Sequence, residues 1–481
     1  MIAKNTFYNF LGLGLPLIVA IFTIPVLIDT LGVARFGVLT LVWAFVSYAS
    51  LLDMGLGRAL TLELSTINAK QKYLRIPKVL GTTYVLMLGI GIVLGLVVIV
   101  FSSSFTDLLK GLDGKNEVIA TIQIMALTIP FVILSAGSRG ILEAYGRFDI
   151  VNLIRVPIGV MTFLGPVIVV WFWDVRLDFI AVALFLIRAI SFILYFWYAQ
   201  VNLPVLQRKL KIDLRYSKSL VINGGWMTVS NVISPLMGYL DRFLIGALIG
   251  ATAVSYYATP HEIITKLWII PGALAAVLFP IFASRLAGNE KSEANLYSDS
   301  VNVIFFIMLP LCAFFMLFEQ EILTLWVGAS FATESKYILM LLSLGMLINS
   351  LAIVPFTYIQ GKGKAKVTAY IHLVEFPVFI GFLWWLLNEV GVVGAAIAWV
   401  IRLLVDTVLM LYFALKYSEN GEGRIGIRSI MIYVFSIAFL TIVVINDLRI
   451  DLKALVQIMI GLSVLIYFLI KYKNFKGDYG N

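Results

Sequence analysis

The sequence predicts an all-α integral membrane protein with 14 transmembrane helices, and three observations lead to this class. Of its 481 residues, 61% are hydrophobic and only 13% are charged, whereas about 25% are charged in a soluble domain. The apolar residues form stretches of the roughly 20 residues that cross a bilayer. The basic residues concentrate in alternate links between these stretches. This composition excludes a soluble enzyme, a disordered chain and a disulfide-rich secreted scaffold.

The apolar stretches follow one another with short links, the longest being about 200–218 and 105–117. The first stretch is too long for the apolar core of a signal peptide and lacks a small-residue cleavage site, so we interpret it as a helix. No link could hold a nucleotide-binding domain, and the P-loop motif is absent. The expected spans are 6–29, 37–60, 79–104, 118–141, 150–173, 177–199, 219–247, 253–283, 297–318, 333–359, 366–388, 391–415, 427–446 and 451–470.

The charge of the links orients the chain, because the cytoplasmic links of membrane proteins are enriched in Lys and Arg. With the N-terminus inside, 25 of the 36 basic residues fall in inner segments and seven in outer segments. Both termini are therefore expected in the cytoplasm. The same bias accounts for the net charge of +9, so no nucleic-acid partner is expected.

Three pairs of similar segments indicate an internal repeat. The matched pairs are Gly32 with Gly250, Gly146 with Gly361 and Arg188 with Arg402, at offsets of 218, 215 and 214 residues. Each pair alone is weak, but chance does not readily explain three nearly equal offsets. Each half then holds six spans, and because six is even the two halves run in the same sense across the membrane.

The repeat predicts two parallel six-helix lobes, formed by spans 1–6 and 7–12, with two additional C-terminal helices. We expect an N-lobe over 1–200, a cytoplasmic linker over 201–218, a C-lobe over 219–416, and spans 13–14 with a cytoplasmic tail over 417–481. Two parallel bundles with a cleft between them favour transport by alternating access.

Several segments resemble a known family of transporters. They are LGVARFG at 31–37, SYASLLDMGLG at 47–57, and LDRFLIG at 240–246 followed by Tyr256 and Tyr257. These segments are similar to those of Wzx-type O-antigen and polysaccharide flippases, within the multidrug/oligosaccharidyl-lipid/polysaccharide exporter superfamily. The resemblance covers the full chain, including the count of fourteen helices. Its motifs are degenerate, so they indicate the family better than the substrate.

The resemblance implies a V-shaped two-lobe fold in the bacterial cytoplasmic (inner) membrane. It implies a flippase that moves undecaprenyl-diphosphate-linked oligosaccharide, such as an O-antigen or other surface polysaccharide repeat unit, from the cytoplasmic to the periplasmic leaflet. The implied partners are this glycan, membrane lipid, and the polysaccharide polymerase and chain-length machinery.

Cationic residues within the spans are the candidates for binding a diphosphate, because charged groups in lipid are costly and a diphosphate is multiply negative. Arg188 is the clearest, since it lies mid-span with no carboxylate within four residues on its own helix. Arg58, near the inner end of its span, is weaker because it could extend to the interface. The predicted substrate-binding residues are Arg188, Arg242, Lys266, Arg402 and Arg58.

Acidic residues and one histidine within the spans are the candidates for coupling transport to an ion gradient. They are Asp53, Glu262, Glu375, Asp406 and His261, and the sequence does not choose among them. A structural salt bridge between Arg402 and Asp406 fits their four-residue spacing equally well. No cofactor or metal site is expected, because the chain has one cysteine and its two histidines, His261 and His372, are far apart.

Two other functions compete with the flippase. An ion-coupled multidrug/cation antiporter of the same superfamily would favour a cavity rich in carboxylates, whereas these spans carry several arginines. A membrane polymerase acting on lipid-linked sugars would need a large outer loop for its catalytic groups, and the outer links are short. The chain is therefore predicted to be a transporter and not an enzyme.

Overall fold

The computed structural model describes residues 2–49, 56–69, 75–110, 114–202, 211–213, 236–283, 290–418, 425–446 and 449–479. Every regular element within these ranges is a helix, which confirms the predicted all-α class. Contacts divide the chain into unit 1, Met1–Ala258, and unit 2, Thr259–Asn481. The boundary falls inside one helix, and the predicted division into lobes at 200 and 219 stays a prediction.

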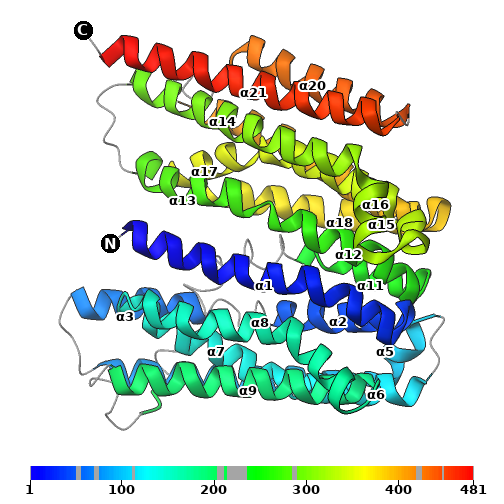
Figure 1. The fold of residues 1–481 in the computed structure, drawn as a ribbon. Coiled ribbons are helices and arrows are strands. Elements are labelled where there is room, and N and C mark those ends of the chain that lie inside the picture. Colours follow the sequence, from blue (N-terminus) through cyan, green and yellow to red (C-terminus); the bar gives the residue numbers. More distant parts are fainter. Residues whose placement is uncertain are drawn as a thin grey trace. The chain divides into compact units, whose positions relative to one another are not determined.

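Of the helices in the described ranges, ten lie within unit 1 and the next begins there (Figure 1). They are α1 (Ile2–Leu31), α2 (Val33–Ala49), α3 (Leu56–Ala69), α4 (Ile76–Val100), α5 (Ser102–Leu108), α6 (Lys115–Ala126), α7 (Thr128–Ala144), α8 (Phe148–Phe172), α9 (Leu177–Asn202), α11 (Leu240–Leu248) and α12 (Ala251–Lys266).

Unit 2 begins within α12 and contains the remaining helices. They are α13 (Ile269–Ala283), α14 (Glu290–Leu317), α15 (Glu319–Val327), α16 (Ala329–Ser350), α17 (Ile353–Gly361), α18 (Ala365–Val390), α19 (Val392–Lys416), α20 (Ile427–Ile445) and α21 (Ile450–Tyr479).

Among the described residues, eleven helical stretches are long and apolar enough to cross a membrane. Two shorter apolar helices, Leu15–Leu31 and Val33–Ser47, coincide with the first two expected spans. The expected seventh span, 219–247, lies mostly outside the described residues, and only α11 represents it. The chain is thus a multi-pass membrane protein with 11–13 candidate spans.

Three expected spans each consist of two consecutive helices, and a proline explains each break. Proline lacks an N–H and collides with the carbonyl four residues earlier. Pro130, Pro271 and Pro355 follow the first residue of the second helix by two positions. The residue four positions before each proline lies at the end of the first helix of its pair. These residues are Ala126, the last of α6, Leu267, just after α12, and Leu351, just after α16. The proline therefore sets where the first helix of each pair ends.

In unit 1, α1 packs most extensively against α8, and the two helices run side by side in Figure 1. Gly159 allows this close approach, since a Cβ there would lie 2.6 Å from Cγ of Pro16. The helices α3, α4 and α9 pack around α7. These contacts bury a cluster that includes Leu60, Leu80 and Leu142.

Two segments that the repeat matches lie against each other in unit 1. The Ser255 hydroxyl donates a hydrogen bond to the Val33 carbonyl at 2.5 Å. A Cβ on Gly37 would collide with the carbonyl oxygen of Ala251. The offset of 218 residues pairs Val33 with Ala251 and Gly37 with Ser255. Val33 therefore contacts the counterpart of Gly37, and Gly37 lies against the counterpart of Val33. Reciprocal contacts of this kind are typical of a two-fold symmetric interface.

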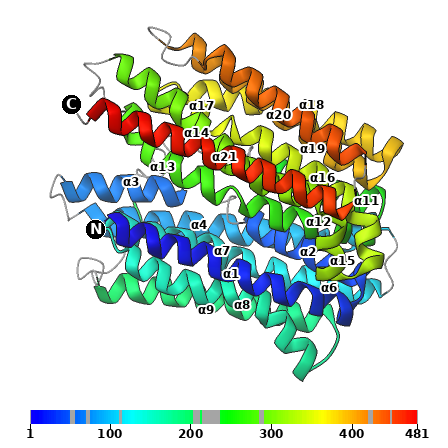
Figure 2. The ribbon, with the colours of Figure 1, turned by 45° about the horizontal axis from the view of Figure 1, so that its top comes forward.

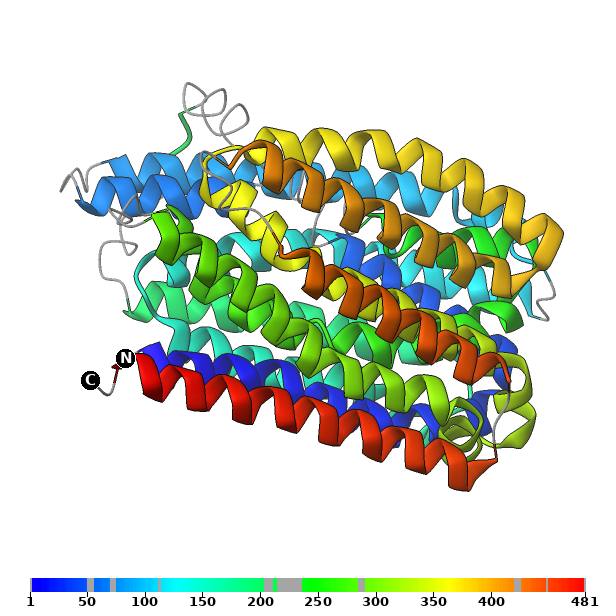
Figure 3. The same cartoon turned by 90° about the horizontal axis from the view of Figure 1, so that it is seen from above.

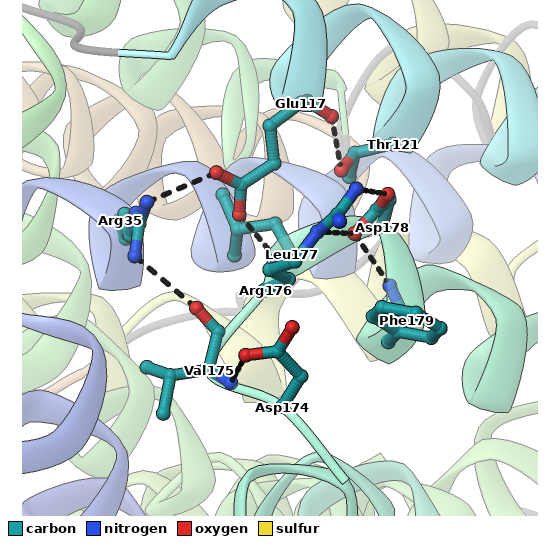
Figure 4. A network of polar contacts seen from close by, with 9 residues as sticks. All are labelled: Arg35, Glu117, Thr121, Asp174, Val175, Arg176, Leu177, Asp178 and Phe179. Atoms are coloured by element: carbon teal, nitrogen blue, oxygen red, sulfur yellow. Dashed lines mark hydrogen bonds and ion pairs between the residues drawn. The ribbon is translucent and has the colours of Figure 1, made fainter.

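A polar network ties three parts of unit 1 together (Figure 4). Arg35 of α2 forms an ion pair with Glu117 of α6 at 3.0 Å and donates to the Val175 carbonyl at 3.2 Å. The other Glu117 oxygen accepts from the Leu177 N–H at 2.6 Å. Nearby, hydrogen bonding and the charge of Asp178 raise the pKa of Arg176. The network joins α2, α6 and the α8–α9 link.

In unit 2, α18 packs against α19, which also packs against α16; Figure 3 shows α18 and α19 side by side. The last two helices, α20 and α21, both pack along α14 (Figure 2). Tyr433 of α20 donates to Asn302 of α14 at 2.5 Å, and Gln457 of α21 donates to the Pro310 carbonyl at 2.9 Å.

Candidate functional site

Arg188 lies on α9 with its side chain half-buried. Its guanidinium approaches the Thr162 hydroxyl of α8 at 3.4 Å, which is long for a hydrogen bond. No carboxylate among the described residues forms an ion pair with it. Because a cation within the spans is costly without a partner, Arg188 keeps its place as the first candidate for an anionic ligand.

Arg242 and its neighbour Asp241 lie on α11, and both side chains are buried. Asp241 accepts hydrogen bonds from the Tyr257 hydroxyl at 2.5 Å and from the backbone N–H of Arg242 at 2.7 Å. The Arg242 guanidinium lies 5.5 Å from the ring centre of Tyr239. The sequence reasoning did not select Asp241, which the structure shows as the acceptor at the centre of this group.

Lys266 and Glu262, four residues apart on α12, form an ion pair at 2.6 Å. The sequence predicts that Lys266 binds substrate and that Glu262 couples transport to an ion gradient. His261, on the same helix, is buried and packs edge-on against the Trp399 ring, with ring centres 5.7 Å apart. Asp53 lies outside the described residues, and of Arg58 only its position on α3 is described.

The structure brings two of the coupling candidates, Glu375 of α18 and Asp406 of α19, together with His372 of α18. One ligand atom of each lies within 4.8 Å of the others, and all three side chains are buried. His372 Nε2 and Asp406 Oδ1 are 3.6 Å apart. Both Glu375 oxygens and His372 Nδ1 lack a hydrogen-bond partner within the described part of the chain. We call these three residues the acid cluster.

Arg402 lies on α19 beside the acid cluster. Its guanidinium packs over the Phe379 ring of α18 at 5.5 Å and interacts electrostatically with Glu375. The four-residue spacing allowed a salt bridge to Asp406, but in the described residues the ion-pair partner of Asp406 is His372. The reason is that α18 packs against α19 and brings His372 to the carboxylate.

The comparisons with known proteins identify the family. A family model described as "Polysaccharide biosynthesis protein" matches residues 26–336. The chain belongs to this family. It is 32% identical over 424 residues to a Shigella flexneri protein described as an O-antigen transporter, covering 88% of this chain and 100% of the relative. It is also similar to the lipopolysaccharide biosynthesis protein WzxC of Escherichia coli, at 22% identity over 78% of this chain and 74% of that protein.

Solved structures show the fold of this polysaccharide family member. The lipid II flippase MurJ in an inward closed conformation matches with a TM-score of 0.73 at 15% identity, covering all of both chains. An inward-facing multidrug resistance MATE family transporter of the MOP superfamily matches with a TM-score of 0.72 at 16% identity, over 85% of this chain and 93% of that one. The resemblance to polysaccharide transporters is confirmed: the chain is of a transporter family, not an enzyme family.

The sequence reasoning left His372 out of the predicted site of this family member, although a signal for it was present. His372 and Glu375 are three residues apart on one expected span, and this spacing places both side chains on one helix face. At the level of the sequence, His372 was left out of the candidate lists because it lies too far from His261 to form a metal site with it. The partner that completes the group is a carboxylate on the next helix.

Proposed function

We propose that this polysaccharide family member is a flippase that moves undecaprenyl-diphosphate-linked oligosaccharide from the cytoplasmic to the periplasmic leaflet. The observation that carries the proposal is Arg188, a half-buried arginine without a carboxylate partner among the described residues. A diphosphate supplies the missing negative charge, and a guanidinium binds phosphate oxygens in a bidentate manner. Arg242, Lys266, Arg402 and Arg58 complete the proposed binding set.

The two best-supported cations occupy matched positions of the repeat. The offset of 214 residues pairs Arg188 of α9 with Arg402 of α19. In this proposal the headgroup binds to cationic side chains within the spans while the prenyl chain stays in lipid. The glycan polymerase and chain-length machinery then act on the product at the outer surface.

The proposed topology has fourteen spans, with two parallel six-helix lobes forming a V-shaped cleft, in the bacterial inner membrane with both termini cytoplasmic. It is tested with reporters fused along the chain. A reporter active only in the cytoplasm should work at residues 70, 210, 364 and 478, and a periplasmic one near 112, 330 and 389. Cytoplasmic activity at 112 would contradict the span count.

Energy for net transport is proposed to come from an ion gradient. Of the five coupling candidates, Glu375 and Asp406 have the strongest support, because their carboxylates are buried together with His372. Glu262 is paired with Lys266. His261 packs against Trp399, and Asp53 lies outside the described residues.

The acid cluster also supports a second candidate function, a cation antiporter, since buried carboxylates attract cationic drugs. The chain shares its fold with a MATE transporter. The neighbouring Arg402 opposes this function, because it places a permanent positive charge beside the acids. The flippase remains the function that accounts for Arg188.

The function is tested in a bacterial strain that lacks its own O-antigen flippase and carries the glycan-synthesis genes of this chain's source organism. The wild-type chain should restore surface polysaccharide, and Arg188→Ala should not, at equal amounts of protein in the membrane. A drug-sensitive strain serves as the parallel test. Restored drug resistance without restored polysaccharide would support the antiporter and overturn the flippase.

A further inference from the structure

The acid cluster of His372, Glu375 and Asp406 brings three buried polar side chains together. Each residue is at most 7% exposed. Both Glu375 oxygens, Asp406 Oδ1 and His372 Nδ1 lack a hydrogen-bond partner within the described ranges. Buried polar atoms are normally satisfied, and a buried unsatisfied group is costly. Two carboxylates and an imidazole this close together therefore point to a cationic ligand that satisfies them.

The cluster lies deep within the spans. Glu375 is ten residues from the start of α18, and Asp406 is ten residues from the end of α19, so each is about 15 Å from the same end of the helix pair. Lys364, just before α18, and Lys416, the last residue of α19, mark that end. With a hydrocarbon core about 30 Å thick, the cluster is near its middle.

Within the described part of the chain, few other charged or titratable groups lie near the cluster. The helices packed against α18 are α17 and α19, and α16 and α17 also pack against α19. The charged and titratable residues of α16 are Glu334, Lys336 and Tyr337 near its start, whereas Thr407, next to Asp406, donates to the Ile348 carbonyl near its end. From α17, the Phe356 ring stacks on His372 with ring centres 6.2 Å apart, and the titratable Tyr358 instead packs against Phe282 and Tyr297. From α19, the charged group beside Asp406 is Arg402, which interacts electrostatically with Glu375.

The donor set favours a proton over hard metal cations. Sodium, calcium and magnesium prefer cages of several oxygen ligands, whereas this cluster offers two carboxylates and a nitrogen. A proton needs no cage, because a single carboxylate oxygen or imidazole nitrogen binds it. A proton taken from water and held by one carboxyl group would also remove one of two neighbouring negative charges, because such groups titrate as a unit.

The number of protons bound to the cluster changes the negative charge beside Arg402. We propose that His372, Glu375 and Asp406 form a proton-binding site whose occupancy controls the affinity of Arg402 for a diphosphate headgroup. When the cluster is deprotonated, its negative charge holds the guanidinium and repels an approaching diphosphate. When a proton neutralises a carboxylate, that opposing charge is removed and Arg402 attracts the anion more strongly. This inference rests on the proposed function, since it requires a diphosphate ligand.

The direction in which pH changes the diphosphate affinity follows from thermodynamic linkage. A proton that strengthens diphosphate binding must itself bind more tightly when diphosphate is present. The diphosphate affinity should therefore rise as the pH falls. One coupled proton changes the affinity by up to about tenfold per pH unit over the range where the cluster titrates. The ligand acts in the opposite direction, because a phosphate with a second pKa of about 6 loses negative charge on acidification.

The experiment measures binding of farnesyl diphosphate to the purified full chain in lipid nanodiscs at about pH 6 and about pH 8, which differ about a hundredfold in proton activity. Choline is the only added cation. The compared quantity is the affinity of the wild-type chain divided by that of the Glu375→Gln/Asp406→Asn double variant. This ratio should fall by up to about tenfold for each unit by which the pH rises. The double variant mimics the protonated cluster and cancels the ligand's own titration. Asp406→Asn alone, which keeps the side-chain shape, replaces it if the double variant does not fold.

Glu389→Gln is the matched control, because Glu389 is an exposed carboxylate near the other end of the same helix. It should behave as the wild-type chain does. Arg402→Gln should bind more weakly and lose the pH dependence. If it keeps the pH dependence, the proposed link through Arg402 is overturned.

Three further outcomes separate this inference from the proposed function. If the wild-type chain binds farnesyl diphosphate with the same pH dependence as the double variant, the proton site is overturned and the flippase stands. If sodium at constant pH changes the affinity and pH does not, the cluster is a sodium site and the inference is again overturned. If the wild-type chain does not bind the diphosphate at either pH, the proposed function fails as well.

Discussion

Arg188 in unit 1 and Arg402 in unit 2 occupy matched positions of the repeat, but their surroundings differ. Arg188 has the Thr162 hydroxyl at 3.4 Å, and the residue four positions later is Phe192, which packs among other phenylalanine rings. The residue four positions after Arg402 is Asp406, and Glu375 interacts with Arg402 electrostatically. Unit 1 surrounds its arginine with apolar and neutral groups, whereas unit 2 surrounds its arginine with acids.

Because their surroundings differ, Arg188 and Arg402 cannot attract an anion in the same way. An arginine is charged at every physiological pH. In unit 1 nothing described offsets that charge, so the attraction for an anion is constant. In unit 2 the nearby acids offset it to an extent that depends on their protons. Arg188 therefore offers a constant attraction to an anion, and Arg402 offers one that depends on the protons of its acidic neighbours.

The largest effect is expected from removing the permanent cation. Arg188→Ala should abolish polysaccharide export, because no other described cation takes its place on α9, and Arg188→Lys should retain part of it. Surface polysaccharide is measured together with the amount of chain in the membrane. Normal export by the Ala variant would remove the strongest support for a cationic binding site and would make the two regions equivalent.

A substitution can give Arg188 an acidic neighbour like that of Arg402. Phe192→Asp places a carboxylate four residues after Arg188, where it can form an intrahelical ion pair. Export should fall strongly, since the constant cation is now neutralised. Phe192→Asn is the control, because it changes the shape in the same way without adding charge. Equal loss in both variants would show that the aromatic contacts matter and not the charge.

A third prediction exchanges Arg402 and Asp406. A pair that serves only structure would tolerate the exchange, since each charge keeps a partner on its helix. Because Asp406 pairs with His372 of α18, we expect the exchanged variant to reach the membrane in reduced amount and not to export. Asp406→Ala should lower stability by about 1–3 kcal/mol, the usual cost of unpairing a buried polar group. Full recovery of export in the exchanged variant would establish a structural salt bridge instead.

The smallest effect is expected at Thr162. Its hydroxyl is 3.4 Å from the guanidinium of Arg188, beyond the usual hydrogen-bond range, so it holds the side chain only weakly. Thr162→Val, which keeps the shape, should reduce export about two- to fivefold, the equivalent of about 0.5–1 kcal/mol. A loss as large as that of Arg188→Ala would mean that Thr162 itself contacts the ligand.

Most of the fold follows from features that are local in the sequence. Apolar length predicted the spans, because lipid cannot hydrogen-bond to backbone groups and helices satisfy them internally. The three broken spans were not predicted. A proline follows each break, but the prolines inside α1, α8, α12, α14 and α18 leave those helices continuous. The contact of the matched segments around Gly37 and Ser255 was not predicted, because similarity between segments does not show that they touch.

The candidate site divides in the same way. The sequence alone determined that Arg188 has no acid nearby on its own helix, because four residues span one helical turn and the sequence shows every neighbour within it. It could not choose between Arg402 and His372 as the partner of Asp406. His372 and Asp406 are 34 residues apart, and their contact depends on which faces of α18 and α19 meet. The tertiary structure decided that point, because the rotation of two packed helices is set by all the side chains between them.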